Sequence, residues 1–325
     1  MALGHTQEYR TVFRQHLLSV LLLWLSALLV ACDASTDTEL VDLEDQVSDE
    51  ELVQFAVSPP KGTDYKTLCF GFDLRASPLE DSRQYLPFLN YLQASTGYTF
   101  ELRFTPKGSS IIDDLGSGKV HFAAIGAVSY IQGNKKHGLI SLARGLNRQN
   151  KAVYKSMIVV HPDSSIKTMA DLKARRFTFG SVDSTQGHLI PRIILGENGI
   201  TLDDLSSYEY TGSHLNCANA VVSRKSDACG MQDTMARTMQ QQGLVRILHE
   251  SDYFPSSGIV VNPNVPPEII ARVKQALINF EPTGKHKNGL YHWAMTEMPN
   301  GFTSSSDEDY QELRKWLINL GLIES

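Results

Sequence analysis

Short apolar runs alternate with helical apolar patterns along the chain from about residue 66 onward. In the first helical pattern, Tyr85, Phe88, Leu89 and Leu92 share one face and Gly97 ends the helix. Runs of β-forming residues predict strands over 67–72, 98–104, 120–125, 154–161, 177–179, 207–210 and 244–249. Helices are predicted over 81–96, 109–115, 189–199, 266–278 and 310–320, with another opening at 126–130. This alternation predicts an α/β protein.

The first 65 residues follow a different pattern. Arg10 and Arg14 precede an apolar run over 17–31, which is typical of a secretory signal peptide, here residues 1–31. Leu29-Val30-Ala31-Cys32 resembles the bacterial lipobox, in which the Cys carries the lipid, so Cys32 is the predicted lipidation site. The alternative is a transmembrane anchor with an incidental Cys. Residues 32–65 are acidic at first and then contain Pro59-Pro60-Lys61-Gly62, which predicts an extended tether ending in a linker.

Composition narrows the class of protein. The formal net charge is −6 and there is no basic stripe, which argues against nucleic-acid binding. Besides Cys32, three cysteines remain, without a C-x-x-C motif or other metal-ligand spacing, so neither a metal nor a cofactor is predicted. Cys69, Cys217 and Cys229 are interpreted as small buried hydrophobes, and a Cys217–Cys229 disulfide stays open in an exported protein.

The segment 177–192 carries the candidate chemistry. It reads as a strand, a turn of small residues and the start of a helix that Ser184 or Thr185 would cap. Free N–H groups and a partial positive charge make such a helix start an anion site. The two hydroxyls add donors, and His188 one turn later could add another. The segment is neither a P-loop nor a Gly-x-Ser-x-Gly nucleophile elbow, and a simple helix cap is the alternative.

The run Ser184-Thr185-Gln186-Gly187-His188-Leu189-Ile190-Pro191 resembles the Ser-Thr-Ser-Gly-x-x-x-Pro signature of periplasmic proteins that bind phosphate, phosphite and phosphonates for ABC importers. In that family the Ser-Thr pair and neighbouring backbone amides hold the phosphorus oxyanion. Gln186 stands where the family usually has a second Ser, and its amide can still donate.

The resemblance implies a two-lobed type II periplasmic binding protein fold. Each lobe would be a mostly parallel sheet flanked by helices, and two strands would form the hinge. Lobe 1 would comprise residues 66–155 and 257–325, and lobe 2 residues 156–256. The partners implied are a small phosphorus oxyanion and the permease subunits of an ABC transporter.

Further positions match the family's pattern. Ser129 and Tyr130 follow the third predicted strand, where we expect them to face the cleft, and Tyr154 lies on the strand that crosses to lobe 2. His214 stands where the family has a pocket His. Leu215 replaces a Glu of members that bind aminoalkylphosphonates, so simple anions should outcompete 2-aminoethylphosphonate. Each position also has a structural alternative. Ser129 could be a helix cap and Tyr130 a half-buried side chain, Tyr154 an ordinary strand residue, and His214 a cap or surface residue.

Three functions are compatible with these patterns. The first is an importer's substrate-binding lipoprotein, and the second is the same module sensing ligand for a membrane signalling partner. The third, an enzyme on the same fold, is disfavoured because the sequence offers neither a metal cluster nor an activated nucleophile pair.

The lipid anchor is directly testable. In Cys32→Ser we expect unprocessed precursor without diacylglycerol, because the thiol is the group that would be lipidated. Mass spectrometry of the N-terminus in both proteins measures this. The same unlipidated mature N-terminus in wild type and variant would show that Cys32 is not an anchor.

Overall fold

The computed structural model describes residues 65, 67–73, 75–106 and 109–324. The predicted signal peptide, Cys32 and the tether up to residue 64 lie outside this range. Among the described helices, none has both the length and the apolar character needed to cross a bilayer.

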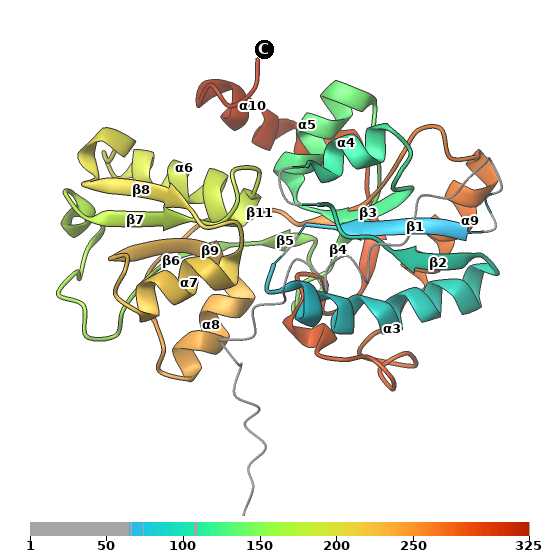
Figure 1. Ribbon diagram of the computed structural model, residues 1–325, viewed down its shortest axis with the longest axis horizontal. Coiled ribbons are helices and arrows are strands. Elements are labelled where there is room, and N and C mark those ends of the chain that lie inside the picture. Colours follow the sequence, from blue (N-terminus) through green and yellow to red (C-terminus); the bar gives the residue numbers. More distant parts are fainter. Residues whose placement is uncertain (1–64, 66, 74, 107–108, 325) are drawn as a thin grey trace, which may run out of the picture. The chain divides into compact units, whose positions relative to one another are not determined.

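The first sheet has the strand order β13-β4-β12-β3-β1-β2. Its strands are β1 (Thr67–Phe72), β2 (Thr99–Leu102), β3 (Phe122–Ile125), β4 (Ile140–Gly145), β12 (Gly258–Val261) and β13 (Phe302–Ser304). The helices that go with it are α3 (Pro78–Thr96), α4 (Ile111–Gly116), α5 (Ala127–His137), α9 (Pro267–Ile278) and α10 (Gln311–Asn319). These elements form lobe 1 (Figure 1).

The second sheet has the order β10-β6-β9-β7-β8. Its strands are β6 (Ser156–Val160), β7 (Arg176–Phe179), β8 (Ser207–Tyr210), β9 (Ala228–Gln232) and β10 (Arg246–Glu250). With it go a π-helical turn, η2 (Thr185–Leu189), and the helices α6 (Ile190–Glu197), α7 (His214–Val222) and α8 (Asp233–Gln241). These elements form lobe 2.

The chain passes between the two sheets twice. The short strands β5 (Val153–Tyr154) and β11 (Phe254–Pro255) pair antiparallel at the crossing and lead into β6 and β12 (Figure 1). Since β6 and β12 enter their sheets from the other lobe, both pair antiparallel with their neighbours. Each sheet is therefore mixed, with parallel pairs at β1–β2, β1–β3, β7–β8 and β7–β9, rather than mostly parallel as predicted.

Local chemistry accounts for where the elements begin and end. Helix α3 starts three residues earlier than predicted, because Ser77 accepts a hydrogen bond from the Glu80 N–H at 3.3 Å and Pro78 suits the first turn. It ends at Gly97, which has φ 77°. Among the elements that the sequence did not indicate are β4, α8 and β13. They are short or weakly apolar, and packing against lobe neighbours stabilises them.

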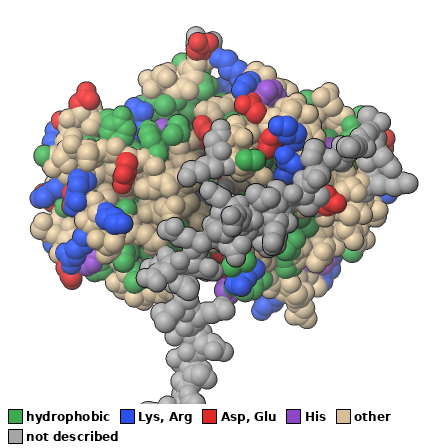
Figure 2. Space-filling view, in the orientation of Figure 1, with side chains coloured by type: hydrophobic (Ala, Val, Ile, Leu, Met, Phe, Trp, Pro, Cys, Tyr) green, Lys and Arg blue, Asp and Glu red, His purple; other side chains and the backbone are tan. Residues whose placement is uncertain are grey.

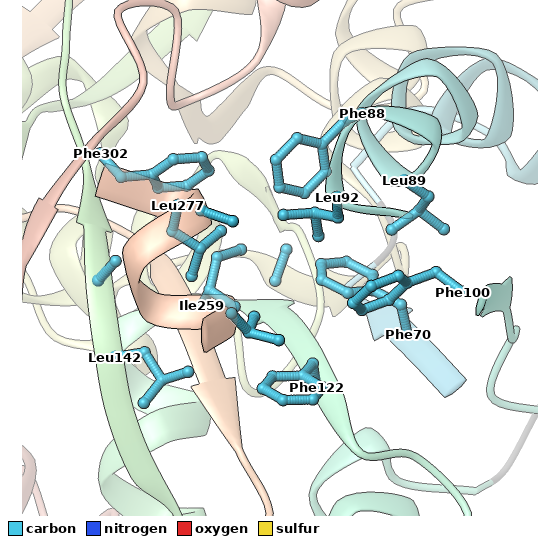
Figure 3. Packing of buried hydrophobic residues seen from close by; sticks show 14 of the residues in the cluster. Phe70, Phe88, Leu89, Leu92, Phe100, Phe122, Leu142, Ile259, Leu277 and Phe302 are labelled. Atoms are coloured by element: carbon cyan, nitrogen blue, oxygen red, sulfur yellow. The ribbon is translucent and has the colours of Figure 1, made fainter. Parts of the chain in front are cut away.

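The core of lobe 1 is aromatic. Helix α3 directs Phe88 and Leu92 toward Phe302, Leu277 and the strand residues below them (Figure 3). The ring centroid of Phe88 lies 4.9 Å from that of Trp293 and 5.1 Å from that of Phe280. At the surface, side chains of both charges are interspersed, as the face in Figure 2 shows. The apolar packing holds the sheet rigidly and so fixes the strand ends at which a site can form.

Lobe 2 contains a cross-link. Cys217 on α7 and Cys229 on β9 form a disulfide between residues 12 positions apart, and Cys69 is free and buried. The disulfide left open by the sequence is thus formed, and it fastens α7 to the sheet.

Removing this cross-link should weaken lobe 2. Closing so short a loop contributes about 2–3 kcal/mol to stability. We expect Cys217→Ala with Cys229→Ala to lower the urea midpoint, and a reductant to lower that of the wild type to a similar value. The double variant, which lacks the disulfide, serves as the control for effects of the reductant itself. An unchanged wild-type midpoint in reductant would contradict the disulfide.

Candidate functional site

Polar residues from both lobes meet at the carboxyl ends of the parallel strands. Asp73 follows β1, and Gly126 follows β3 and precedes α5. Ser181 and Ser184 lie on the turn after β7. Ligands of open α/β sheets bind at this edge, outside the carboxyl ends of the strands.

These residues line one cavity. Its lining comprises Asp73, Arg75, Gly126, Tyr154, Ser181, Ser184, Thr185, Gln186, His214, Ser257 and Glu297. The volume of this cavity is about 20 Å³, which is little more than a single water molecule requires. The lobes are therefore closed on each other, and a polyatomic ligand requires them to separate.

Two helical N-termini meet beside the cavity. In η2, Ser184 is the N-cap and its Oγ accepts the Gly187 N–H at 2.9 Å. The Thr185 Oγ1 accepts the Val128 N–H from the first turn of α5 at 2.9 Å. Helix N-termini carry partial positive charge, so this arrangement suits an anion without a formal cation.

Gly187 and Gln186 shape the turn. A Cβ at Gly187 would lie 2.8 Å from Ser184 Oγ and 3.0 Å from His214 Cε1, so a glycine lets the imidazole pack against the turn. The Gln186 Nε2 donates to the Lys155 carbonyl at 2.7 Å. The Ser156 hydroxyl donates to the Gln186 carbonyl at 2.6 Å, which ties η2 to β6.

Several buried polar atoms on the lining lack a hydrogen-bond partner within the described protein. They are Arg75 Nε, Tyr154 Oη, Gln186 Oε1 and His214 Nδ1. The Tyr154 hydroxyl faces those of Thr185 and Ser257 without a well-formed hydrogen bond. Buried polar groups without partners are costly, and each one in a native structure calls for an explanation such as a bound group. This cluster makes the cavity the candidate binding site.

The charged groups on the cavity lining are one guanidinium and two carboxyls. Arg75 and Glu297 form a buried ion pair at 3.2 Å, and the Arg75 guanidinium keeps the pKa of Glu297 below its ordinary value despite burial. Burial raises the pKa of Asp73 to about 6, against the opposing effect of Arg75. Burial lowers the pKa of His214 to about 4, so this imidazole is neutral at pH 7. One of its ring nitrogens can therefore accept a hydrogen bond from a ligand.

Four of the predicted ligand-binding residues do not line the cavity. The Gly187 amide is held by Ser184, and the Ser129 hydroxyl donates to Asp73 Oδ2 at 3.2 Å. The Tyr130 hydroxyl donates to Asp307 Oδ1 at 3.0 Å and its ring packs on Tyr310, so it points away from the cleft it was expected to face.

His188 also lies off the cavity. Its Nδ1 lies 2.6 Å from the Val182 carbonyl, and its Nε2 lies 3.0 Å from the Tyr210 hydroxyl. Both ring nitrogens are therefore engaged within lobe 2. Burial lowers the pKa of His188, which opposes the charge-assisted donor that the sequence suggested.

The sequence reasoning missed Asp73, Arg75 and Glu297. Asp73 could have been found, because a charged residue directly after the first strand lies at the ligand-binding edge of the sheet. Glu297 gives no local signal, since it lies between a 3₁₀ turn and β13 and reaches the cavity only through the packing of lobe 1.

Two other kinds of site receive less support. Among the described residues, no group of three or more His, Cys, Asp or Glu side chains is arranged to hold a metal. A larger, open hollow of about 360 Å³ lies between α3 and α9. Its polar side chains include the Tyr91 hydroxyl, bonded to the Ala276 carbonyl, and His286, whose Nδ1 accepts the Glu281 N–H. Among the described residues, none of the buried polar atoms that lack a hydrogen-bond partner belongs to the lining of this hollow.

Comparison with known proteins agrees with this geometry. Residues 70–310 match the family model described as "ABC transporter, phosphonate, periplasmic substrate-binding protein". The phosphonates-binding periplasmic protein of Escherichia coli K12 is 24% identical over 262 residues, which cover 77% of this chain and 75% of that protein.

Solved structures share the fold. PhnD1 of Prochlorococcus marinus MIT 9301, solved in complex with methylphosphonate, superposes with a TM-score of 0.72 at 18% identity, covering 80% of this chain and all of that one. A binding protein of an ABC phosphonate transporter from Pseudomonas aeruginosa gives 0.70 at 20% identity, covering 79% and 87%. The predicted two-lobed type II periplasmic binding protein fold is confirmed. The chain belongs to the family of periplasmic substrate-binding proteins of phosphonate ABC transporters.

Proposed function

We propose that this chain is a membrane-tethered lipoprotein that binds phosphite, phosphate or a phosphonate and delivers it to the permease subunits of an ABC importer. Membership of the family makes it an exported substrate-binding transport protein, and the family is not one of enzymes. The lipid on Cys32, the tether and the choice of ligand are the finer parts of the proposal. The lobes it assumes are residues 66–155 with 257–325, and residues 156–256.

One observation supports the ligand class above all others. Unpartnered buried polar atoms converge on a cavity beside which the N-termini of η2 and α5 meet. A tetrahedral oxyanion could accept from the backbone N–H groups and hydroxyls there. Ser184 and Thr185 would hold it, and Gln186, Tyr154 and His214 would surround it. Of the other predicted contacts, Gly187 shapes the turn and Ser129 holds Asp73, while Tyr130 and His188 face elsewhere.

Selectivity against 2-aminoethylphosphonate stays a prediction. Leu215, on which it was based, is half-buried and is not part of the cavity lining. The carboxyl groups of Asp73 and Glu297 do line it. A panel of phosphite, phosphate, methylphosphonate and 2-aminoethylphosphonate, titrated by calorimetry, tests the proposed function. Absence of binding to every member would refute it.

Ser184 and Thr185 should each contribute to affinity. We expect Ser184→Ala and Thr185→Val to weaken binding of the best ligand in the panel by about 1–3 kcal/mol, the usual cost of losing a hydrogen bond to a charged group. Calorimetry gives the affinities, and circular dichroism checks the fold.

A matched control separates binding from capping. Ser110 caps α4, away from the cavity, by accepting the Ile112 N–H at 3.2 Å. Ser110→Ala should cost about 1 kcal/mol of stability, as losing a cap does, and leave affinity unchanged. If Ser184→Ala behaves like Ser110→Ala and Thr185→Val binds normally, the two residues serve only the helix.

A further inference from the structure

A carboxylate, that of Asp73, occupies the N-terminus of α5, close to the Thr185 hydroxyl. The Asp73 Oδ2 accepts the Gly126 N–H at 2.8 Å and the Ser129 hydroxyl at 3.2 Å. A Cβ built on Gly126 would lie 3.6 Å from Asp73 Oδ2 and 3.0 Å from Thr185 Oγ1. Both oxygens thus border the same small space. Lobe 2 offers donors to an oxyanion there, and lobe 1 presents an acceptor.

An oxyanion between these groups must share a proton with Asp73. Two carboxylate or phosphate oxygens at hydrogen-bond distance repel unless one carries hydrogen. A phosphorus oxyacid supplies that hydrogen, because its second proton dissociates near neutral pH, as in phosphate esters, where the pKa is about 6. A sulfonate of the same shape is fully ionised and has no such proton.

We propose that Asp73 makes the cavity require a protonated oxyanion, so that it accepts phosphorus oxyacids and rejects sulfonates and sulfate. This inference rests on the proposed function, whose site it refines. The proton lies in one hydrogen bond between the ligand oxygen and the Asp73 carboxyl, and no covalent bond changes.

The charged and titratable groups facing Asp73 leave it as the acceptor. Arg75 is paired with Glu297, and His214 on α7 is neutral at pH 7. Tyr154 on β5 and Tyr85 on α3 stay protonated, because burial raises the pKa of both hydroxyls. Asp183, on the turn before η2, adds a negative charge and raises the pKa of Asp73. Burial is the main cause that raises that pKa, to about 6, so at pH 7 the Asp73 carboxyl is mostly ionised and accepts a hydrogen bond.

Methylphosphonate and methanesulfonate form a matched pair of probes. They have nearly the same shape, and the singly protonated phosphonate has the charge of the sulfonate, so the acidic hydrogen distinguishes them. We expect the wild type to prefer methylphosphonate by at least about 100-fold in calorimetry, because a site built for a hydrogen-bonding group rejects an analogue that lacks it. In Asp73→Asn, the amide nitrogen can donate instead, and the preference should fall below about 10-fold.

Asp183→Asn is the control variant. It removes the same charge near the cavity, but Asp183 is exposed and is not part of the lining, so the preference should stay as in the wild type. A preference that Asp183→Asn abolishes equally would show a field effect and overturn the role of Asp73.

Proton uptake tests the wild type without any variant. Above the second pKa of methylphosphonate, binding should take up about one proton and weaken about tenfold per pH unit. Titration in buffers of different ionisation enthalpy measures the uptake. Absence of uptake, or equal binding of methanesulfonate, would overturn the inference even if Asp73→Asn fails to fold.

The remaining outcomes separate this inference from its premise. If Asp73→Asn keeps the preference but loses 2-aminoethylphosphonate selectively, the carboxylate pairs with an ammonium and the inference is wrong. If the wild type binds methylphosphonate while Asp73→Asn discriminates normally, the inference alone fails. If the wild type binds no phosphorus oxyanion, the proposed function fails.

Discussion

The hydrogen bond from the Val128 N–H to the Thr185 hydroxyl joins the two lobes at the point where their helices converge. It places the first turn of α5 against η2, so two partial positive charges meet over one small cavity. The strand ends supply the rest: Asp73 after β1, Gly126 after β3 and Ser184 after β7. If the lobes separated, this contact would break and the hydroxyls would become exposed.

Charge is used sparingly in this site. The one guanidinium on the lining, Arg75, is held by Glu297 and by the Asp73 carbonyl, at 3.2 and 2.8 Å. An anion would therefore be held mainly by fixed dipoles and hydroxyls, which have directions that a point charge lacks. Because each fixed donor needs an acceptor and each fixed acceptor needs a donor, such a site can distinguish ligands by their protonation state. A carboxylate on the lining is therefore compatible with an anion that carries a proton.

The wide turn of η2 follows from its neighbours. Gly187 lets His214 pack within a distance that any side chain would prevent, and the Ser156 hydroxyl holds the Gln186 carbonyl. His188 is anchored between Val182 and Tyr210. π-Helical turns are uncommon and occur frequently at functional sites. Here the turn brings Ser184, Thr185 and Gln186 together on the cavity side.

The sequence by itself determined what depends on neighbours in the chain. Ser184 caps the turn after β7, and Gly97 ends α3, because a cap needs only the next few residues. It also indicated the order of strands and helices. Tertiary structure alone decided which side chains reach the cavity. Arg75 and Glu297 pair across 222 positions, and Asp307, far along the chain, turns Tyr130 away from the cleft. Such contacts come from packing between distant elements, which local patterns of residues do not encode.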